Sequence, residues 1–157
     1  MKFICSLIVV EDVLKSRTLY EKILNQKVTA DFGENVAFEG GFAIHQKSHY
    51  KKLINEKPIQ TKSNSFELYF EHDEVIDIQN ILKREGFEFV HEVREQPWRQ
   101  MVLRFYDYDN NIIEIGETME HVAYRLFLEN KDIEEIAKIT YLDREKIVNS
   151  INSYKEK

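Results

Sequence analysis

Apolar side chains in the first part of the chain fall into short blocks, and residues typical of turns separate these blocks. Residues 3–10 form a continuous apolar run of strand length, whereas residues 13–25 carry apolar side chains at helical spacing behind a potential N-cap, Asp12. Gly40 and Gly41 stand between two further blocks and mark a hairpin. The pattern therefore predicts a strand, a helix and three strands, at residues 3–10, 13–25, 27–31, 35–39 and 42–46.

The same order of patterns returns after residues 47–64, a polar connector in which we expect one helical turn near residues 50–54. In residues 66–71 apolar and polar side chains alternate, as in a strand with one buried face. Asp73 can cap the helix that follows, and Gly86 stands where that helix should end. The second half is thus predicted as a strand, a helix and three strands, at residues 66–71, 74–84, 88–93, 100–106 and 112–115. The chain contains an internal repeat of about 60 residues.

The rest of the chain, residues 118–157, carries a helical pattern throughout. Its first helix has an apolar stripe at helical spacing, made of Met119, Val122, Ala123, Leu126 and Phe127. Two shorter helices, at residues 132–140 and 143–154, each begin at an aspartate suited to N-capping. We therefore divide the chain into a domain of residues 1–117, with modules at about 1–46 and 65–117, and a helical extension of residues 118–157.

Composition narrows the class of protein. The 157 residues carry a formal net charge of −6, which argues against a general nucleic-acid binder because such proteins need a basic surface. Cys5 is the only cysteine, so no disulfide can form within the chain, and a reducing cytoplasm is the expected setting. The first apolar run is too short for a signal peptide and meets Glu11 and Asp12 at once. No apolar run approaches the roughly 20 residues that span a bilayer, so we expect no membrane association.

Glu114 is the most informative single residue. It lies inside the predicted strand 112–115, on the opposite side from Ile113 and Ile115. A carboxylate in a central strand should be paired, bound to a metal, or facing a wet cavity, and a solvent-exposed sheet face is the equally weighted alternative. Aligning the two halves of the repeat places His45 opposite Glu114, and Cys5 opposite Glu67.

Four segments carry a resemblance to a known family. They are Val10-Glu-Asp-Val-Leu-Lys-Ser with Leu19-Tyr20 following, Phe70-Glu-His-Asp-Glu-Val, Gln96-Pro-Trp, and the run Arg104-Phe-Tyr-Asp-Tyr-Asp-Asn-Asn-Ile-Ile-Glu-Ile-Gly-Glu, which is the most specific. Over residues 2–117 the chain resembles the vicinal oxygen chelate superfamily, which contains glyoxalase I, bleomycin resistance proteins, fosfomycin resistance enzymes and extradiol dioxygenases. In the family pattern F-x-D-P-D-G-N-x-x-E, Tyr108 replaces the proline and Asn110 replaces the glycine. Asparagine tolerates a positive φ, so we expect the turn to be kept. Arg99 stands where similar sequences often have glycine, which changes the shape of the expected pocket mouth.

The resemblance implies an α+β fold in which two paired βαβββ modules form a cup-shaped mixed sheet around a divalent metal. The implied ligands come from the first and last strands of each module and are Cys5, His45, Glu67 and Glu114. Two carboxylates with one imidazole accept Zn, Ni, Mn or Fe. Metal-binding relatives usually have histidine at the position of Cys5, so a working site, a weakened site and a pocket that has lost its metal all stay open.

Glu114 and Glu67 are also the candidate catalytic groups, either as metal ligands or as bases that move a proton. The candidate substrate contacts, for which ordinary packing and surface charge are the alternatives, are Trp98, Arg99, Tyr69 and Phe105.

Three functions stay open. The first is a metalloenzyme of lyase, isomerase or dioxygenase type that chelates vicinal oxygens of a small substrate. The second, which Cys5 favours, is a non-catalytic ligand binder like the bleomycin resistance proteins. The third is a ligand-sensing regulator, because residues 133–148 resemble a helix-turn-helix. From Glu120 onward, however, the tail has seven basic and eight acidic residues, so a packing role is favoured over DNA binding. The expected partners are a small molecule and a second copy of the chain in a homodimer.

Overall fold

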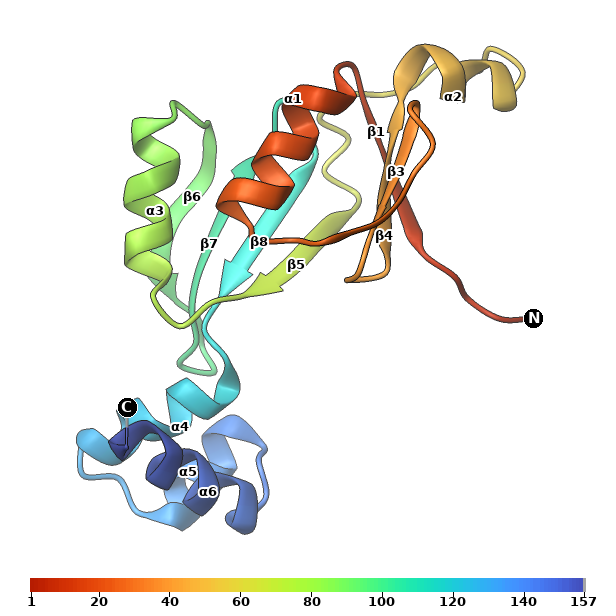
Figure 1. Ribbon diagram of the computed structural model, residues 1–157. Helices are drawn as coiled ribbons and strands as arrows, with labels where there is room; N and C mark the ends of the chain where they lie inside the picture. The colour runs from red at the N-terminus through yellow and green to blue at the C-terminus, as the bar shows by residue number, and fades with distance from the viewer. Residues whose placement is uncertain (157) are drawn as a thin grey trace.

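The computed structural model describes residues 1–156 and contains two four-stranded sheets with a cluster of helices at the C-terminus (Figure 1). The first sheet has the strand order β1-β4-β3-β2, and the second has the order β5-β8-β7-β6. In each sheet the first and last strands of the module are parallel neighbours, and the other neighbours are antiparallel. The predicted α+β fold, with two βαβββ modules and a helical extension, is therefore confirmed.

The first module consists of β1 (Ser6–Val10), α1 (Val13–Thr18), the π-helical turn η1 (Leu19–Ile23), β2 (Val28–Asp31), β3 (Asn35–Phe38) and β4 (Phe42–Gln46). The connector begins with α2 (Lys47–Leu53). The second module consists of β5 (Glu67–Glu71), α3 (Val75–Arg84), β6 (Phe89–Glu95), β7 (Met101–Tyr106) and β8 (Ile112–Gly116). The extension consists of α4 (Met119–Leu128), α5 (Ile133–Thr140) and α6 (Arg144–Lys155).

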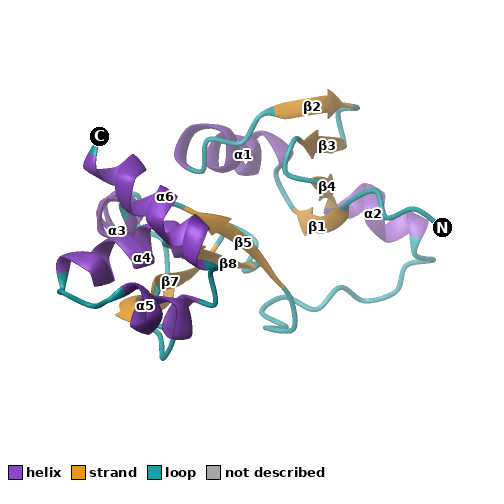
Figure 2. Cartoon of the chain, turned by 90° about the horizontal axis from the view of Figure 1, so that it is seen from below, coloured by secondary structure: helices purple, strands orange, loops and turns teal. Residues whose placement is uncertain are grey.

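Each sheet has one apolar face, and these two faces share a single core with α1 and α3. Leu19, Leu82 and Ile113 are fully buried in it, and each such side chain contributes about 1.5–3 kcal/mol by leaving water. The two sheets remain separate layers within the chain (Figure 2). Because side chains alternate along a strand, the face opposite the core carries His45 in the first sheet and Glu114 in the second.

The turn of residues 107–111 joins the two modules. Asp107 accepts hydrogen bonds from the backbone N–H of Asp109 and Asn111, at 2.9 and 2.8 Å, and this closes the turn. The hydroxyl of Tyr20, in the first module, donates to Asp107 at 3.0 Å. Asn110 has a φ of 64°, so the prediction that asparagine replaces the family's glycine at a left-handed position is confirmed.

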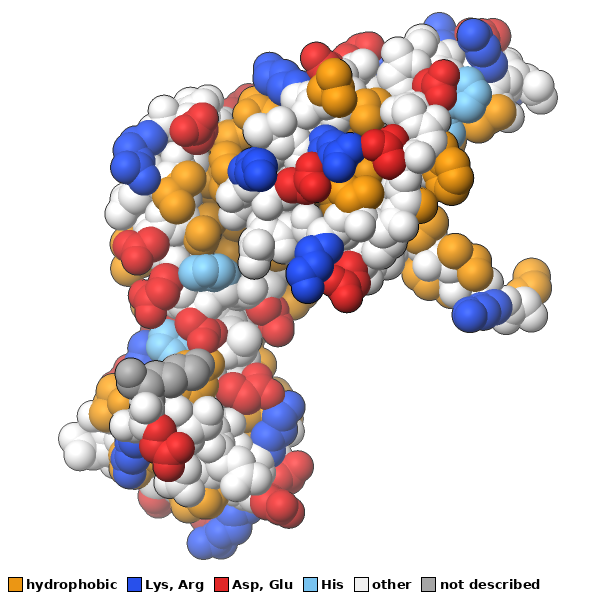
Figure 3. Space-filling view, in the orientation of Figure 1, with side chains coloured by type: hydrophobic (Ala, Val, Ile, Leu, Met, Phe, Trp, Pro, Cys, Tyr) orange, Lys and Arg blue, Asp and Glu red, His pale blue; other side chains and the backbone are white. Residues whose placement is uncertain are grey.

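The first strand is shorter than predicted. It begins at Ser6 rather than residue 3, because its partner β4 begins at Phe42, and the register pairs these two residues. Residues 1–5 project away from the sheet (Figure 1). The apolar side chains of Phe3 and Ile4 are exposed there, and Figure 3 shows hydrophobic atoms along this arm. The arm therefore carries apolar surface that nothing within the described residues covers.

The helices α4, α5 and α6 enclose an apolar core of their own, which includes Leu126, Ile136 and Ile147. They lie beyond one end of the second sheet (Figure 1), and their surface mixes acidic and basic side chains (Figure 3). No helix within residues 1–156 has the length and apolar character needed to cross a membrane.

The sequence predicts that Asp73 caps α3, and the structure corrects this. Asp73 attaches the helical extension to the second module instead. The N-cap residue of α3 is Glu74, whose side chain makes no capping bond. Asp73 instead accepts a hydrogen bond from the hydroxyl of Thr118 at 2.7 Å and another from the hydroxyl of Tyr154. The predicted caps Asp12, Asp132 and Asp143 are confirmed, each accepting from the backbone N–H three residues further on.

Candidate functional site

The outward face of the second sheet brings two of the candidate residues, Tyr69 and Glu114, into one row with Arg104. Tyr69 in β5 pairs with Glu114 in β8, and Glu114 pairs with Arg104 in β7. Paired residues on adjacent strands point to the same face, so all three side chains lie together. Glu67 joins them, because it lies two residues before Tyr69 on the same strand and therefore shares its face.

Arg104 links the two carboxylates of this face. Its Nε donates to Glu67 at 2.8 Å, and its Nη2 forms an ion pair with Glu114. Its Nη1 lies 3.2 Å from Nε2 of His91 in β6. Burial lowers the pKa of His91, the bond to the backbone of Glu92 opposes this, and the positive charges of Arg94 and Arg104 lower it further. The ring is therefore neutral at pH 7, and its Nε2 accepts a hydrogen bond from Arg104. The guanidinium is thus held on three sides by polar partners.

A rim of polar and aromatic side chains borders this cluster. Trp98 donates its indole N–H to Gln100 at 2.8 Å, and the amide of Gln100 donates to the hydroxyl of Tyr69 at 2.8 Å and to the backbone oxygen of Glu117 at 2.6 Å. A Cβ at Gly116 would lie 3.0 Å from Gln100, so glycine lets the amide approach the strand. Gln100 is buried, whereas Trp98 and Tyr69 are 43% and 45% exposed. Two aromatic surfaces are therefore fixed in position but open to a ligand.

Tyr69 keeps its proton over the physiological range. Burial raises its pKa to about 12, although the hydrogen bond from Gln100 opposes that rise. Its hydroxyl donates to Glu71 at 3.1 Å. Tyr69 is therefore a fixed hydroxyl group of the rim and not a base.

Arg99 and Phe105 lie away from this face. Arg99 has a φ of 70°, in the region that glycine favours, and its guanidinium pairs with Glu95 at 2.6 Å and Glu129 at 2.9 Å. Phe105 is fully buried in the core and packs against Phe87, because alternation along β7 points it to the side opposite Arg104. Phe105 is therefore a core residue and not the expected substrate contact, whereas Arg99 lies in a salt-bridge network and its contact with a substrate stays a prediction.

The outward face of the first sheet presents a different set of groups. His45 is 7% exposed, and both of its ring nitrogens have partners: Nδ1 lies 3.1 Å from the amide of Asn35, and Nε2 lies 2.8 Å from Nδ1 of His49. Cys5 is exposed and precedes β1. It lies four residues before Val9, the register partner of His45, which is about 13 Å along an extended chain.

The strand register shows that the two pairings drawn from the repeat cannot both hold. Tyr69, two residues after Glu67, pairs with Glu114. Leu7, two residues after Cys5, pairs with Ala43, which lies two residues before His45. Placing Cys5 opposite Glu67 is therefore two residues out of step with placing His45 opposite Glu114.

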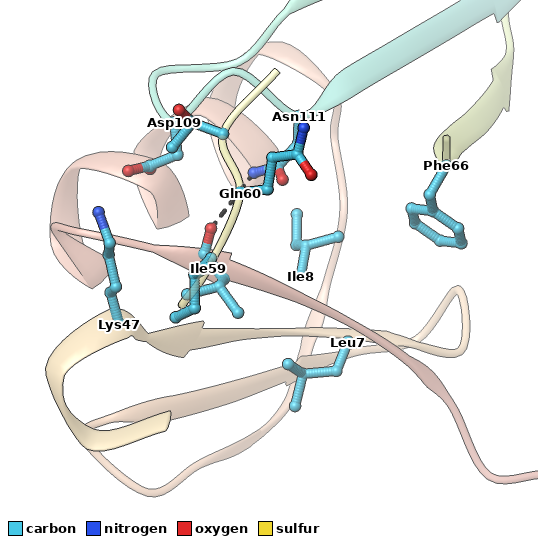
Figure 4. Close-up of a pocket in the computed structure, with 10 residues that line it drawn as sticks. Leu7, Ile8, Lys47, Ile59, Gln60, Phe66, Asp109 and Asn111 are labelled. Carbon is cyan, nitrogen blue, oxygen red and sulfur yellow. Dashed lines mark hydrogen bonds between the residues drawn. The ribbon is translucent and has the colours of Figure 1, made fainter. Parts of the chain in front are cut away.

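A cavity of about 210 Å³ lies between the modules, beside β1 (Figure 4). Lys47 and Asp109 stand at one end and Phe66 at the other. The amide of Asn111 crosses this gap and donates to the backbone oxygen of Val9 at 3.3 Å. The cavity is thus part of the junction that the 107–111 turn makes with the first module.

A family model described as a glyoxalase-like domain matches residues 3–120 of this chain. The chain belongs to the glyoxalase-like family. No curated protein matches it. Among solved structures, a protein of unknown function from Agrobacterium tumefaciens str. C58 is 35% identical with a TM-score of 0.66, and the match covers 75% of this chain and 94% of that one.

Two further structures resemble this glyoxalase-like chain in fold alone. A lactoylglutathione lyase from Agrobacterium tumefaciens is 15% identical with a TM-score of 0.56, over 74% of this chain and 92% of that one. A fosfomycin resistance protein from Listeria monocytogenes is 18% identical with a TM-score of 0.57, over 78% of this chain and 98% of that one.

The divalent metal that the glyoxalase resemblance implies does not fit the side chains as they stand. Glu67 and Glu114 both bind Arg104, while both ring nitrogens of His45 have other partners and Cys5 is exposed outside the strand. Within residues 1–156, no group of three or more His, Cys, Asp or Glu side chains is arranged to hold a metal ion. Sequence reasoning missed Arg104, although a charged residue inside a predicted strand, in the same motif as Glu114, is a visible signal.

The buried His45 makes the stability of this glyoxalase-like domain depend on pH. Burial, and then the neighbouring His49, lower the pKa of His45 below its usual 6.5, although Glu34 opposes this shift. The unfolded chain then binds the proton more readily, so His45 stabilises the fold above about pH 6.5 and loses that effect as the pH falls. We expect His45→Gln to lose less stability between about pH 7 and about pH 5 than the native protein, as measured by urea unfolding at both values. Parallel pH profiles for the two proteins would show that His45 does not titrate with folding.

Proposed function

We propose that this protein binds a small organic molecule against the outward face of its second sheet, where Tyr69 and Trp98 provide flat apolar surface. The observation that carries the proposal is the rim of Trp98, Gln100 and Tyr69, because its hydrogen bonds fix two half-exposed rings before any ligand arrives. Glu67 and Glu71 offer carboxylate oxygens beside these rings, which suit hydroxyl or amine groups of a ligand. The best-supported activity is therefore ligand binding.

A homodimer is part of this proposal. The two sheets of one chain are separate, so their outward faces do not cover each other. Leu7 on the outward face of the first sheet is 38% exposed and offers apolar surface to a second copy. A second copy can place its first module over the rim of the second module and so enclose the ligand, as the family resemblance implies. The expected molar mass in light scattering is that of two chains.

Trp98→Ala is expected to weaken binding of a hit ligand by at least about fivefold, because stacking on an aromatic side chain contributes about 1–3 kcal/mol. Hits would come from a thermal-shift screen of small molecules with and without chelator, and affinities from calorimetry. Trp98→Phe should bind with intermediate affinity because it keeps the ring but loses the N–H donated to Gln100.

The matched control is Tyr141→Asn, since Tyr141 is an aromatic residue 89% exposed on the helical extension, and asparagine tolerates its φ of 58°. This variant should bind like the native protein. Native affinity in Trp98→Ala, with the fold intact, would contradict the proposed site.

A metal-dependent lyase, isomerase or dioxygenase is the second candidate. The observation in its favour is that Glu67 and Glu114 share one cation, the guanidinium of Arg104, on the same face of the sheet. Its experimental sign is ligand stabilisation or turnover that a chelator abolishes and an added divalent metal restores. Stabilisation that is equal with and without chelator supports the metal-free binder instead.

A further inference from the structure

We propose that the guanidinium of Arg104 is a built-in cation that takes the place of a divalent metal between Glu67 and Glu114. What holds these two carboxylates does not depend on which molecule the protein binds. Arg104 is a residue that the family resemblance did not bring into the site. With Arg104 in this position, the two carboxylates are neutralised without a metal ion.

The contacts of Arg104 match those expected of a central cation. Its Nε lies 2.8 Å from one oxygen of Glu67, and its Nη2 lies 3.4 Å from the other, so the guanidinium holds this carboxylate in a bidentate contact. Nη2 also pairs with Glu114, whose side chain is only 10% exposed. One cation therefore balances a buried carboxylate and a partly exposed one, where without it two like charges would face each other.

His91 completes the enclosure. Its Nδ1–H donates to the backbone oxygen of Glu92 at 2.9 Å, which leaves Nε2 free of a proton and directed at Arg104. An imidazole in this tautomer, beside two carboxylates, is a donor set that a divalent transition metal also accepts. The guanidinium thus lies among three groups whose donor atoms suit a metal, and within residues 1–156 these groups are not arranged around a common metal position while it is there.

The other half of the expected donor set is not available in the first module. Cys5 is exposed and precedes β1, and both ring nitrogens of His45 have partners in Asn35 and His49. A metal at this site would lack those two donors and would also have to displace Arg104 from its charge-assisted hydrogen bonds. Both features disfavour the metal relative to the arginine.

Removing the positive charge should expose the latent site. In Arg104→Met, which keeps an unbranched side chain of comparable length, Glu67, Glu114 and His91 lose their shared cation, and a divalent ion becomes the best available counter-charge. We expect chelator-treated Arg104→Met to bind Co²⁺ at least tenfold more tightly than the native protein, measured by calorimetry and by cobalt absorption in the visible range. Its thermal midpoint should rise with Co²⁺, and that of the native protein should not.

Three further variants define the site. Arg94→Met removes a neighbouring arginine and should leave Co²⁺ affinity at the native level. Arg104→Lys keeps a positive charge and should also remain at that level, so it tests the inference even where Arg104→Met folds poorly. Arg104→Met combined with Glu114→Gln should lose the gained affinity, whereas a Co²⁺ site that persists unchanged in this double variant would overturn the inference.

The native protein alone can also overturn it. One equivalent of metal retained through purification without chelator, and a fall in the thermal midpoint when that metal is stripped, would show that Arg104 does not stand in for a metal. Failure of the proposed ligand binding is a separate result, because it would appear in the Trp98 variants and not in Co²⁺ affinity.

Discussion

Asp107→Ala is expected to lower the free energy of unfolding by about 4 kcal/mol. Asp107 is 5% exposed and accepts hydrogen bonds from two backbone N–H groups, from the amide of Asn111 at 2.9 Å and from the hydroxyl of Tyr20 at 3.0 Å. Burial raises the pKa of Asp107 and these donors lower it, so the donors offset part of the cost of burying the carboxylate. Alanine would leave all of these donors without their acceptor.

The loss of unfolding free energy in Asp107→Ala should exceed the loss from removing any single hydrogen bond of the network. Tyr20→Phe removes one donor only, and we expect it to cost about 1–2 kcal/mol, while Asp107→Asn should fall between the two. Urea unfolding followed by circular dichroism gives the three values. A cost below that of Tyr20→Phe for Asp107→Ala would show that the turn does not join the modules.

Arg125→Met is expected to cost about 3 kcal/mol and to loosen the helical extension. Arg125 in α4 donates to Glu117 from Nε at 3.1 Å and from Nη2 at 3.0 Å, and it also donates to the backbone oxygen of Arg99. The side chain of Glu117 is only 3% exposed, so removing Arg125 leaves a buried carboxylate without its cation. Burial alone would lower the pKa of Arg125, but the hydrogen bond and the charge of Glu117 raise it above its usual value.

The test is a double-variant comparison. Combining Arg125→Met with Glu117→Met removes both charges, so this pair should recover most of the lost stability. Hydrogen exchange should show faster exchange in α4 and in residues 96–100 for Arg125→Met alone, because the arginine contacts both. If the double variant is no more stable than the single one, Glu117 does not need this cation.

The fold could be read from the sequence because each module repeats its pattern and its turn chemistry. The turn at Asp107 and the left-handed Asn110 both belong to a motif in which residue type and backbone conformation are tightly linked. Apolar alternation in 66–71 likewise assigned Leu68 to the core and Tyr69 to the outward face. These features depend on neighbours in sequence, so no tertiary information was needed.

The site could be read only in part, because it depends on register between distant strands. Aligning Cys5 with Glu67 and aligning His45 with Glu114 differ in register by two residues, and a slip of two keeps every side chain on the same face. The hydrophobic pattern therefore could not detect it. The partners of Arg104 and Asp73 were also hidden, since each lies more than 35 residues from one of its partners along the chain.

A crystal structure of the native protein soaked in Co²⁺, with an anomalous map at the cobalt edge, tests the central claim most directly. We predict no anomalous peak between Glu67 and Glu114, with the guanidinium of Arg104 bonded to both carboxylates. A peak at about 2.0–2.2 Å from oxygens of both carboxylates, with Arg104 turned away, would contradict the claim and return the protein to the metal-dependent members of its family.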